Sequence, residues 1–311
     1  MSYCVMLEPD QVDQFRDNGY LLINDGLSDG DLQPVIDEYD VFVDRLANSL
    51  GRKGKVGNLC ADEPFATRLA SLCRQDEATY READQLVDIA SVLGPSTFDL
   101  LTNKRLLDLV ESIIGPKITC SPIQHVRCKL PSNLWDGDSS YVAPWHQDAQ
   151  VHTEEADKHF ILTVWIPLVD TDERNGCLKI IPGAHRSEKV LWSKGFGISQ
   201  ANLPDGEVFS LPMKRGDVLF LHKLTPHCSD PNLTDAIRWS MDLRYQRTGT
   251  ASVRSCYPEF VARNDVDPSS VLKDPVVWKR AWESALRMHP RKLPRNTRPS
   301  EPVTQQLDSY V

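Results

Sequence analysis

The stretch Pro144-Trp145-His146-Gln147-Asp148 places a histidine and an aspartate two residues apart, in a segment with strand-like neighbours. Because side chains alternate along a strand, the imidazole of His146 and the carboxylate of Asp148 are predicted to face the same space. These are two of the three ligands of the 2-His-1-carboxylate triad, which holds Fe(II) and leaves positions open for substrates. A His-x-Asp pair alone is a weak signal, so a metal site also requires a third ligand, an anchor for a co-substrate and a suitable β-fold.

Short runs of strand-forming residues surround this stretch at close intervals. Residues 160–168 are almost continuously apolar, and the turn at 214–216 introduces a further run. Short strands separated by turn signals predict an antiparallel sandwich or barrel. The predicted strands are 20–23, 118–130, 141–148, 160–168, 177–183, 208–211, 217–222 and 237–245.

Several segments before these strands carry apolar residues at intervals of three and four, which predicts helices. The predicted helices are 8–19, 28–46, 65–93 and 106–114. The fold is therefore predicted to be mostly β with flanking α, a double-stranded β-helix (jelly-roll) core buttressed by N-terminal helices. We expect a single domain over 1–311, with a helical part at about 8–115, the jelly-roll core at about 118–247 and a C-terminal extension at 248–311. The extension is expected to cover the mouth of the barrel or to contact a second copy, in a monomer or a homodimer.

Charge and composition exclude several classes of function. The net charge of −9 argues against a nucleic-acid binder that works by neutralising phosphates. The sequence has no run of 18 apolar residues, so no membrane span is predicted. Residues 1–8 lack the features of a secretion signal. The last three residues, 309–311, are not a Ser-Lys-Leu peroxisomal address. We therefore expect a cytoplasmic protein whose eight cysteines are reduced and mostly buried.

A later histidine must supply the third ligand. His227 lies just after the predicted strand at 217–222, and Arg238 follows it by eleven residues. An arginine between Ile237 and Trp239 inside a strand needs a partner, and its planar guanidinium suits a carboxylate. That carboxylate could belong to 2-oxoglutarate or to a structural ion pair with Asp242 or Asp235; alternatively, Arg238 lies on an exposed face. The histidine candidates are His152, His159, His185, His222 and His227.

Several motifs in matching order and spacing resemble those of the phytanoyl-CoA dioxygenase family of Fe(II)- and 2-oxoglutarate-dependent oxygenases. The resemblance covers roughly residues 8–247, although 45–110 is poorly anchored. The matching pieces are Trp145 to Asp148, Trp165, Asn175-Gly176-Cys177-Leu178, Pro182-Gly183-Ala184-His185-Arg186, His227 to Asn232, and Arg238.

The resemblance implies a role for each matching residue. His146, Asp148 and His227 would bind iron as the catalytic metal. The guanidinium of Arg238 would bind the distal carboxylate of 2-oxoglutarate, with Ser229 and Trp165 beside it. The resemblance further implies that His185 is structural, and His222 is more often a packing residue than a ligand in such a strand.

Contacts to the organic substrate are harder to assign. Gln147, His125 and Arg127 are candidates: Gln147 lies between two ligands, and the others belong to the polar face of the strand at 118–130. That face either lines the pocket or is exposed to solvent. Segment 51–64 is expected to be a connecting loop, with a mobile lid as the alternative. Further cations that could contact an anionic substrate are Arg52, Lys53, Lys55, Lys129 and Lys194.

These observations predict an Fe(II)- and 2-oxoglutarate-dependent dioxygenase, which consumes O2 and releases succinate and CO2. It would oxidise, most simply by hydroxylation, an unactivated C–H bond of a small organic molecule such as a natural-product intermediate or an acyl thioester. Halogenating relatives lack the carboxylate ligand, so the presence of Asp148 disfavours halogenation. Two alternatives stay open: a cupin-like metalloenzyme that does not use 2-oxoglutarate, and a non-catalytic jelly-roll binding protein.

Overall fold

The computed structural model describes residues 6–134, 142–191, 196–290 and 303–304. Tyr141, where the predicted strand at 141–148 begins, and the candidate contact Lys194 lie outside these ranges. The helices are α1 (Pro9–Asn18), α2 (Asp29–Arg52), α3 (Phe65–Cys73), α4 (Ala78–Leu86), α5 (Ile89–Val92), α6 (Pro95–Leu101), α7 (Lys104–Ile114) and α8 (Pro275–Met288). The strands are β1 (Tyr20–Ile23), β2 (Lys117–Cys120), β3 (His125–Lys129), β4 (Ile161–Pro167), β5 (Leu178–Ile180), β6 (Lys189–Val190), β7 (Phe209–Leu211), β8 (Val218–His222), β9 (His227–Ser229), β10 (Arg238–Arg247), β11 (Phe260–Asn264) and β12 (Val303–Thr304).

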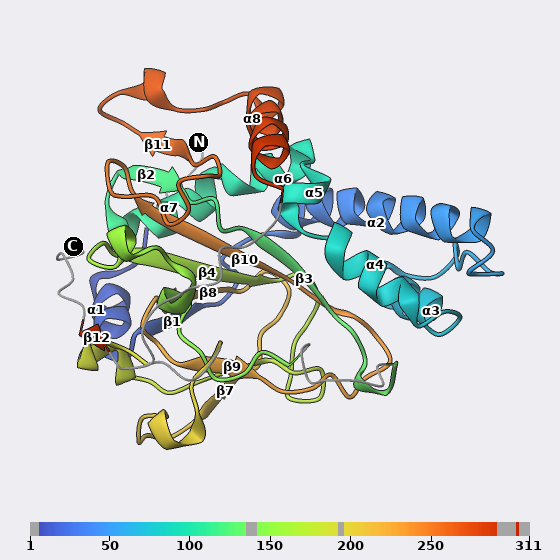
Figure 1. The fold of residues 1–311 in the computed structure, drawn as a ribbon. Coiled ribbons are helices and arrows are strands. Elements are labelled where there is room, and N and C mark those ends of the chain that lie inside the picture. The colour runs from blue at the N-terminus through green and yellow to red at the C-terminus, as the bar shows by residue number, and fades with distance from the viewer. Residues whose placement is uncertain (1–5, 135–141, 192–195, 291–302, 305–311) are drawn as a thin grey trace.

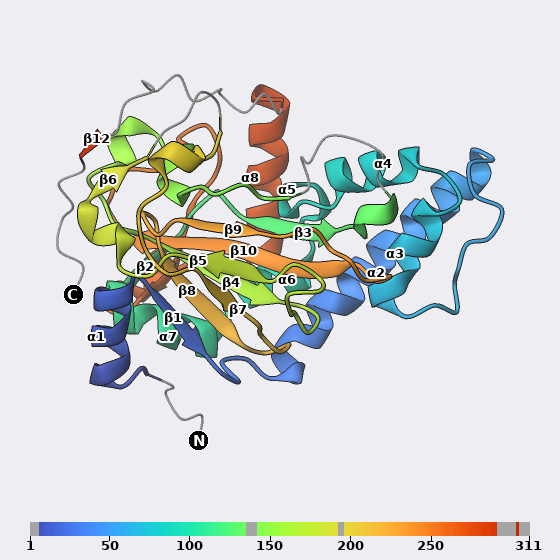
Figure 2. The ribbon, with the colours of Figure 1, turned by 90° about the horizontal axis from the view of Figure 1, so that it is seen from below.

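Two antiparallel sheets form the core of the fold. The major sheet has seven strands in the order β1-β8-β4-β10-β2-β11, and β3 also pairs with β10. The small sheet has the order β7-β5-β9 and lies over one face of the major sheet (Figures 1 and 2). Helices cover the opposite face (Figure 1). The prediction of a mostly β, jelly-roll core with flanking helices is confirmed.

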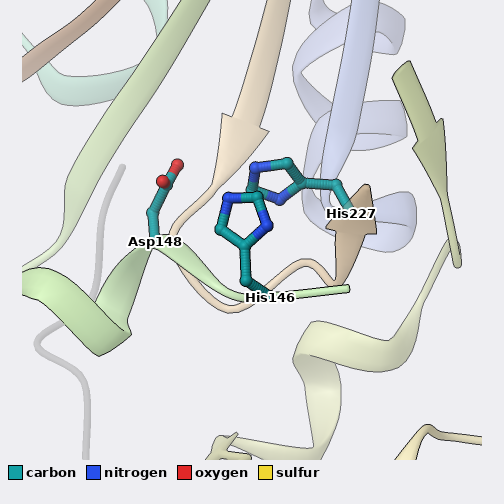
Figure 3. Close-up of side chains that lie close together, drawn as sticks. All are labelled: His146, Asp148 and His227. Atoms are coloured by element: carbon teal, nitrogen blue, oxygen red, sulfur yellow. The ribbon is translucent and has the colours of Figure 1, made fainter. Parts of the chain in front are cut away.

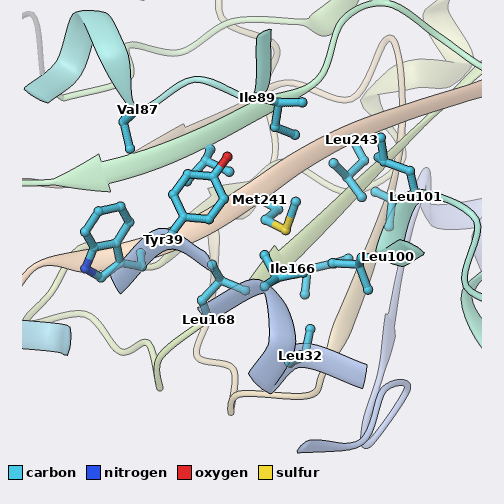
Figure 4. Packing of buried hydrophobic residues seen from close by; sticks show 14 of the residues in the cluster. Leu32, Tyr39, Val87, Ile89, Leu100, Leu101, Ile166, Leu168, Met241 and Leu243 are labelled. Atoms are coloured by element: carbon cyan, nitrogen blue, oxygen red, sulfur yellow. The ribbon is translucent and has the colours of Figure 1, made fainter. Parts of the chain in front are cut away.

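Strand β10 contributes side chains to both faces of the major sheet, one apolar and one polar. Trp239, Met241, Leu243 and Tyr245 are buried in the main hydrophobic core, which is shared with the helices (Figure 4). The alternate residues of β10, which include Arg238, Asp242 and Arg244, point the other way because side chains alternate along a strand. One strand therefore supplies both the core and a row of polar groups facing the small sheet.

Helix α2 packs on the apolar side of the sheet because one of its faces is apolar. Ser28 and Asp31 form a capping box at its N-terminus, which satisfies backbone N–H groups that the helix leaves without partners. Tyr39 of α2 lies with its ring 6.4 Å from that of Trp239 of β10, as measured between ring centroids. The buried residues of α2 are Leu32, Val35, Ile36, Tyr39, Val43, Leu46, Ala47 and Leu50.

Two predicted elements are divided in the structure. The predicted helix at 65–93 is three helices, α3, α4 and α5, and Asp88 begins the last by accepting a hydrogen bond from the backbone N–H of Ile89. The predicted strand at 118–130 is divided into two strands, β2 and β3. The break contains Pro122, because proline lacks the N–H that a central strand needs. Helix α6 and strand β11 were not predicted.

The C-terminal helix α8 packs against α6, on the helical side of the major sheet. The rings of Trp278 and Phe98 are 5.6 Å apart, and those of Trp282 and Tyr257 are 5.5 Å apart and stacked. This part of the extension therefore completes the helical layer and does not cover the mouth of the barrel. In the described part of the chain, no helix has the length and apolar character needed to cross a bilayer. The seven described cysteines are free, and all except Cys256 are buried, as predicted.

Candidate metal centre

His146, Asp148 and His227 form a group that could hold a metal ion. Each offers one ligand atom, and the three atoms lie within 4.8 Å of one another (Figure 3). Their segments meet through an isolated β-bridge, in which His146 and His227 each donate a backbone hydrogen bond to the other's carbonyl at 2.9 Å. The prediction that 141–148 is a strand is wrong within the described residues, because Asp148 begins a 3-10 turn, Asp148–Val151. The turn still directs its carboxylate to the same region as the imidazoles.

Backbone carbonyls fix the orientation of both imidazoles. The Nδ1 atom of His146 lies 2.7 Å from the carbonyl oxygen of Pro144, and the Nδ1 atom of His227 lies 3.0 Å from that of Thr225. A carbonyl oxygen can only accept a hydrogen bond, so each Nδ1 carries the proton and each Nε2 has a free lone pair. This is the tautomer that a metal-binding histidine requires.

Two buried donors hold the carboxylate of Asp148. Arg244 Nη2 donates to Oδ1 and Thr163 Oγ1 donates to Oδ2, both at 2.5 Å. Burial alone would raise the pKa of Asp148, but the guanidinium of Arg244 holds this pKa well below its usual range. Burial, with the neighbouring His227, lowers the pKa of His146 to about 4. At neutral pH the group is therefore an anionic carboxylate and a neutral His146 imidazole, the states that bind a divalent metal.

The segment that carries His227 is hydrogen-bonded to Gly19, which lies between α1 and β1. The carbonyl oxygen of Gly19 accepts a hydrogen bond from the backbone N–H of His222 at 2.9 Å and from Thr225 Oγ1 at 2.6 Å. Gly19 has a φ of 73°, and a Cβ there would lie 2.4 Å from Nδ1 of His185. His185 in turn contacts the carbonyl oxygen of Arg16 through Nε2 at 2.9 Å. These contacts give His185 the structural position that was expected.

A cavity of about 590 Å³ opens beside the metal-binding group. His146 and His227 line it, and so do Arg238, Ser229 and Trp165. The structure therefore brings both sets of predicted residues, those for iron and those for 2-oxoglutarate, to one space. Phe196 also lines the cavity, and its ring centroid lies 5.1 Å from that of His146 although the side chain is largely exposed.

Arg238 is buried without a carboxylate partner among the described residues. Its Nη1 donates to Ser240 Oγ at 3.3 Å, its guanidinium lies 5.4 Å from the centre of the Trp165 ring, and its Nε has no acceptor. Burial is the main cause that lowers its pKa to about 10, so it remains charged at neutral pH. The two structural ion pairs considered from the sequence are not formed. Asp242 pairs with Arg244 at 3.3 Å and Asp235 with Arg74 at 3.5 Å. A buried, unpaired guanidinium on a cavity wall is suited to an anionic ligand.

The candidate substrate contacts have different positions. Gln147 lies outside the cavity lining and uses its amide to bond the backbone of Lys189, Leu191 and Leu224. His125 contacts Asp88 through Nδ1 at 3.1 Å and does not line the cavity. Of these candidates, Arg127 alone lines it, so the structure supports Arg127 and gives Gln147 and His125 bracing contacts instead.

The remaining candidate cations differ in whether they line the cavity. Lys129 lines the cavity, whereas Arg52, Lys53 and Lys55 do not. Lys53 pairs with Glu82 of α4 at 2.6 Å, which ties the segment 51–64 to the helical layer. Among the other histidines, His222 is buried next to Phe160 and His185 and accepts a hydrogen bond from the backbone of Leu224. It does not belong to the metal-binding group.

Arg244 and Thr163, the donors to Asp148, were not anticipated from the sequence. A signal for Arg244 was present, since it lies six residues after Arg238 in one strand and therefore on the same face. No local pattern distinguishes Thr163 inside the apolar strand β4. Its role becomes visible only when β4 is placed next to the turn that carries Asp148.

Comparison with known proteins agrees with the arrangement of the site. The model of the family described as "Phytanoyl-CoA dioxygenase (PhyH)" matches residues 15–240. The peroxisomal phytanoyl-CoA dioxygenase of Rattus norvegicus is 23% identical over 265 residues, which cover 81% of this chain and 73% of the relative. The 1-deoxypentalenic acid 11-beta-hydroxylase of Streptomyces arenae is 30% identical over 162 residues, which cover 48% of this chain and 56% of the relative.

Solved structures share the fold. The non-haem monooxygenase ThoJ, in its apo form, aligns with a TM-score of 0.57 and 17% identity over 90% of this chain and 100% of the other. The non-haem alpha-ketoglutarate-dependent epimerase SnoN from nogalamycin biosynthesis aligns with a TM-score of 0.51 and 21% identity over 79% of this chain and 85% of the other.

Proposed function

The chain belongs to the phytanoyl-CoA dioxygenase family, and on that basis we propose that it hydroxylates an unactivated C–H bond of a small natural-product intermediate. The protein is an oxidoreductase, a non-haem iron dioxygenase that depends on 2-oxoglutarate. The observation that carries the proposal is that one cavity is lined by His146 and His227 of the metal-binding group and by the unpaired, buried guanidinium of Arg238.

His146, Asp148 and His227 would hold the iron, through the two Nε2 atoms and the carboxylate. Bound iron and 2-oxoglutarate supply the activation of O2 and the oxidation of the C–H bond, with release of succinate and CO2. Thr163 and Arg244 keep the Asp148 carboxylate in place, and the hydrogen bonds that the two Nδ1 atoms donate to backbone carbonyls fix the imidazoles.

Arg238 would bind the distal carboxylate of 2-oxoglutarate, next to Ser229 and the ring of Trp165. A guanidinium can donate two parallel hydrogen bonds to a carboxylate, and burial strengthens such a contact because water does not compete. The organic substrate would then occupy the side of the cavity near Arg127 and Phe196, where the lining is exposed.

Two relatives favour a natural-product intermediate over an acyl thioester. One is the 1-deoxypentalenic acid hydroxylase, and another is an ectoine dioxygenase of Bordetella parapertussis, 22% identical over 73% of this chain and 71% of the relative. Retention of Asp148 supports hydroxylation over halogenation. We further propose a cytoplasmic enzyme of one domain, monomeric or homodimeric, that binds neither nucleic acid nor membranes.

The alternatives, a cupin-like metalloenzyme without 2-oxoglutarate and a non-catalytic jelly-roll protein, have no support in the family match. The deciding experiment is anaerobic addition of Fe(II) and 2-oxoglutarate to the metal-free protein. We expect a weak visible charge-transfer band and, after admission of O2, formation of succinate. A folded protein that binds Fe(II) but shows neither signal would contradict the proposed function.

A further inference from the structure

Lys129 and Arg238 are directly opposite each other on neighbouring strands. The register of β3 and β10 pairs Arg238 with Lys129, and both side chains are only 5% exposed. Both line the cavity beside the metal-binding group. Like charges in directly opposite positions of an antiparallel pair destabilise a sheet, and burial increases the cost because water does not screen them. An anionic ligand between the two cations would relieve this repulsion.

Among the described residues, no carboxylate forms an ion pair with either cation, although Asp230 and Asp242 act on them from a greater distance. Lys129 Nζ donates to Ser229 Oγ at 2.7 Å and to the backbone carbonyl oxygen of Asp230, and both acceptors are neutral. The carboxylate of Asp230 instead pairs with Lys179. An ammonium has three N–H donors, so one donor of Lys129 remains available on the cavity wall. Burial, with the charge of Arg238, lowers the pKa of Lys129 to about 7.

We propose that Lys129, together with Arg238, binds the distal carboxylate of the 2-oxoglutarate co-substrate. This inference rests on the proposed function and deepens it, because it assigns to the co-substrate a cation that the sequence suggested as a contact for an anionic organic substrate. Lys129 shares a hydrogen bond with Ser229, two residues after the proposed ligand His227, and both line the cavity. Arg127, by contrast, is exposed and is better placed for the organic substrate.

Two cations around one carboxylate would make the pocket selective among 2-oxo acids. The distal carboxylate of 2-oxoglutarate would compensate the charges of both cations. Pyruvate has no second carboxylate and would leave both cations unpaired. A residue that only supports the backbone at 229–230 would not create this difference. The dependence on the distal carboxylate is therefore the property that separates a binding role from a structural one.

The test measures binding of 2-oxoglutarate and of pyruvate to the Fe(II)-loaded protein by anaerobic calorimetry. We expect Lys129→Met to weaken binding of 2-oxoglutarate by about 10- to 100-fold, the usual effect of losing a hydrogen bond to a charged group, and pyruvate by less than about twofold. Lys129→Arg should recover most of the affinity. Lys117→Met removes an exposed lysine that does not line the cavity, and this variant should bind both acids as the wild type does.

Metal affinity, measured in the same samples, should be unchanged by Lys129→Met and shows that the variant is folded. If that variant does not fold, Lys129→Gln takes its place. A variant that binds 2-oxoglutarate as the wild type does overturns this inference alone. Equal losses for both acids also overturn it and assign to Lys129 a structural role, support of the backbone at 229–230. If the wild type itself does not bind 2-oxoglutarate, the proposed function fails together with the inference.

Discussion

Arg244 and Asp148 form a buried ion pair beside the metal-binding group, with Nη2 and Oδ1 2.5 Å apart and both side chains no more than 4% exposed. The guanidinium orients the carboxylate before any metal arrives. Such supporting contacts typically change metal affinity by about 10- to 100-fold when they are removed. Arg244 therefore acts through Asp148, as a positioning residue.

We expect Arg244→Met to lower the affinity for Fe(II) by about 10- to 100-fold and to destabilise the fold by about 3–5 kcal/mol, because it leaves a buried carboxylate without its partner. Competition with a metal chelator and urea unfolding measure the two effects. Arg263→Met is the control, since Arg263 pairs with Asp108 and Glu111 on the helical side. Equal metal affinity in the two variants would contradict the positioning role.

The neighbouring histidines His222 and His227 differ in their predicted roles. His227→Ala should abolish stoichiometric binding of Fe(II), because it removes a ligand of the proposed triad. His222→Ala should keep the metal but lower the free energy of unfolding by about 2 kcal/mol or more, because it leaves a cavity next to Phe160. Metal content and thermal unfolding distinguish them. Loss of metal in the His222 variant with retention in the His227 variant would reverse the assignment.

The affinity for 2-oxoglutarate should decrease as pH rises above about 7, since burial and Arg238 lower the pKa of Lys129 to about 7. Below this pKa Lys129 is already protonated. Above it, binding of the anion must take up a proton, so affinity falls by up to about tenfold per pH unit. The other groups that act on Lys129 are Asp230, Cys228 and Cys177, which raise its pKa.

Calorimetry between about pH 6 and 9 measures this dependence, with the accompanying proton uptake. In Lys129→Met the slope should disappear, because the titrating group has been removed. A slope that persists unchanged in this variant would assign the titration to another group.

Gly176 should tolerate no side chain. Its φ is 76°, and a Cβ there would lie 2.3 Å from the carbonyl oxygen of Asp230 and 2.9 Å from Nζ of Lys129. We expect Gly176→Ala to destabilise the protein by more than about 1 kcal/mol, the cost of the backbone conformation alone, and to weaken binding of 2-oxoglutarate. Gly54→Ala is the matched control, because Gly54 has a φ of 68° but nothing within 4 Å. Urea unfolding should separate the two variants, and similar losses would show that the contact with Asp230 is unimportant.

The sequence was sufficient to predict the groups that chemistry constrains most tightly. A histidine and an aspartate two residues apart form one group with a second histidine, and the arginine eleven residues after that histidine lines the cavity beside this group. The reason expected for His146 and Asp148 was wrong in part, because a 3-10 turn and not a strand orients Asp148. Their roles as iron ligands stay a prediction.

What the sequence did not predict depends on contacts between distant residues. Arg244 lies 96 residues from Asp148, and Lys129 lies 100 residues from Ser229. No local pattern encodes such distances, so these partners appear only when the strands are paired. The helix boundaries within 65–93 were missed for a similar reason, since packing against the sheet decides where a weakly marked helix stops.

The pairing of β1 with β8 has a consequence for how the protein is made. Tyr20 pairs with Leu221 and Ile23 with Val218, so β1 finds its partner only after the roughly 200 residues that separate the two strands have been synthesised. Strand β10, which lies between β4 and β2, emerges later still. Long-range pairing of this kind is slow, and until it is complete the apolar faces of the helices have no sheet to pack against. The group of His146, Asp148 and His227 is therefore complete only after these strands have paired, and we expect any metal to be inserted at a late stage of maturation.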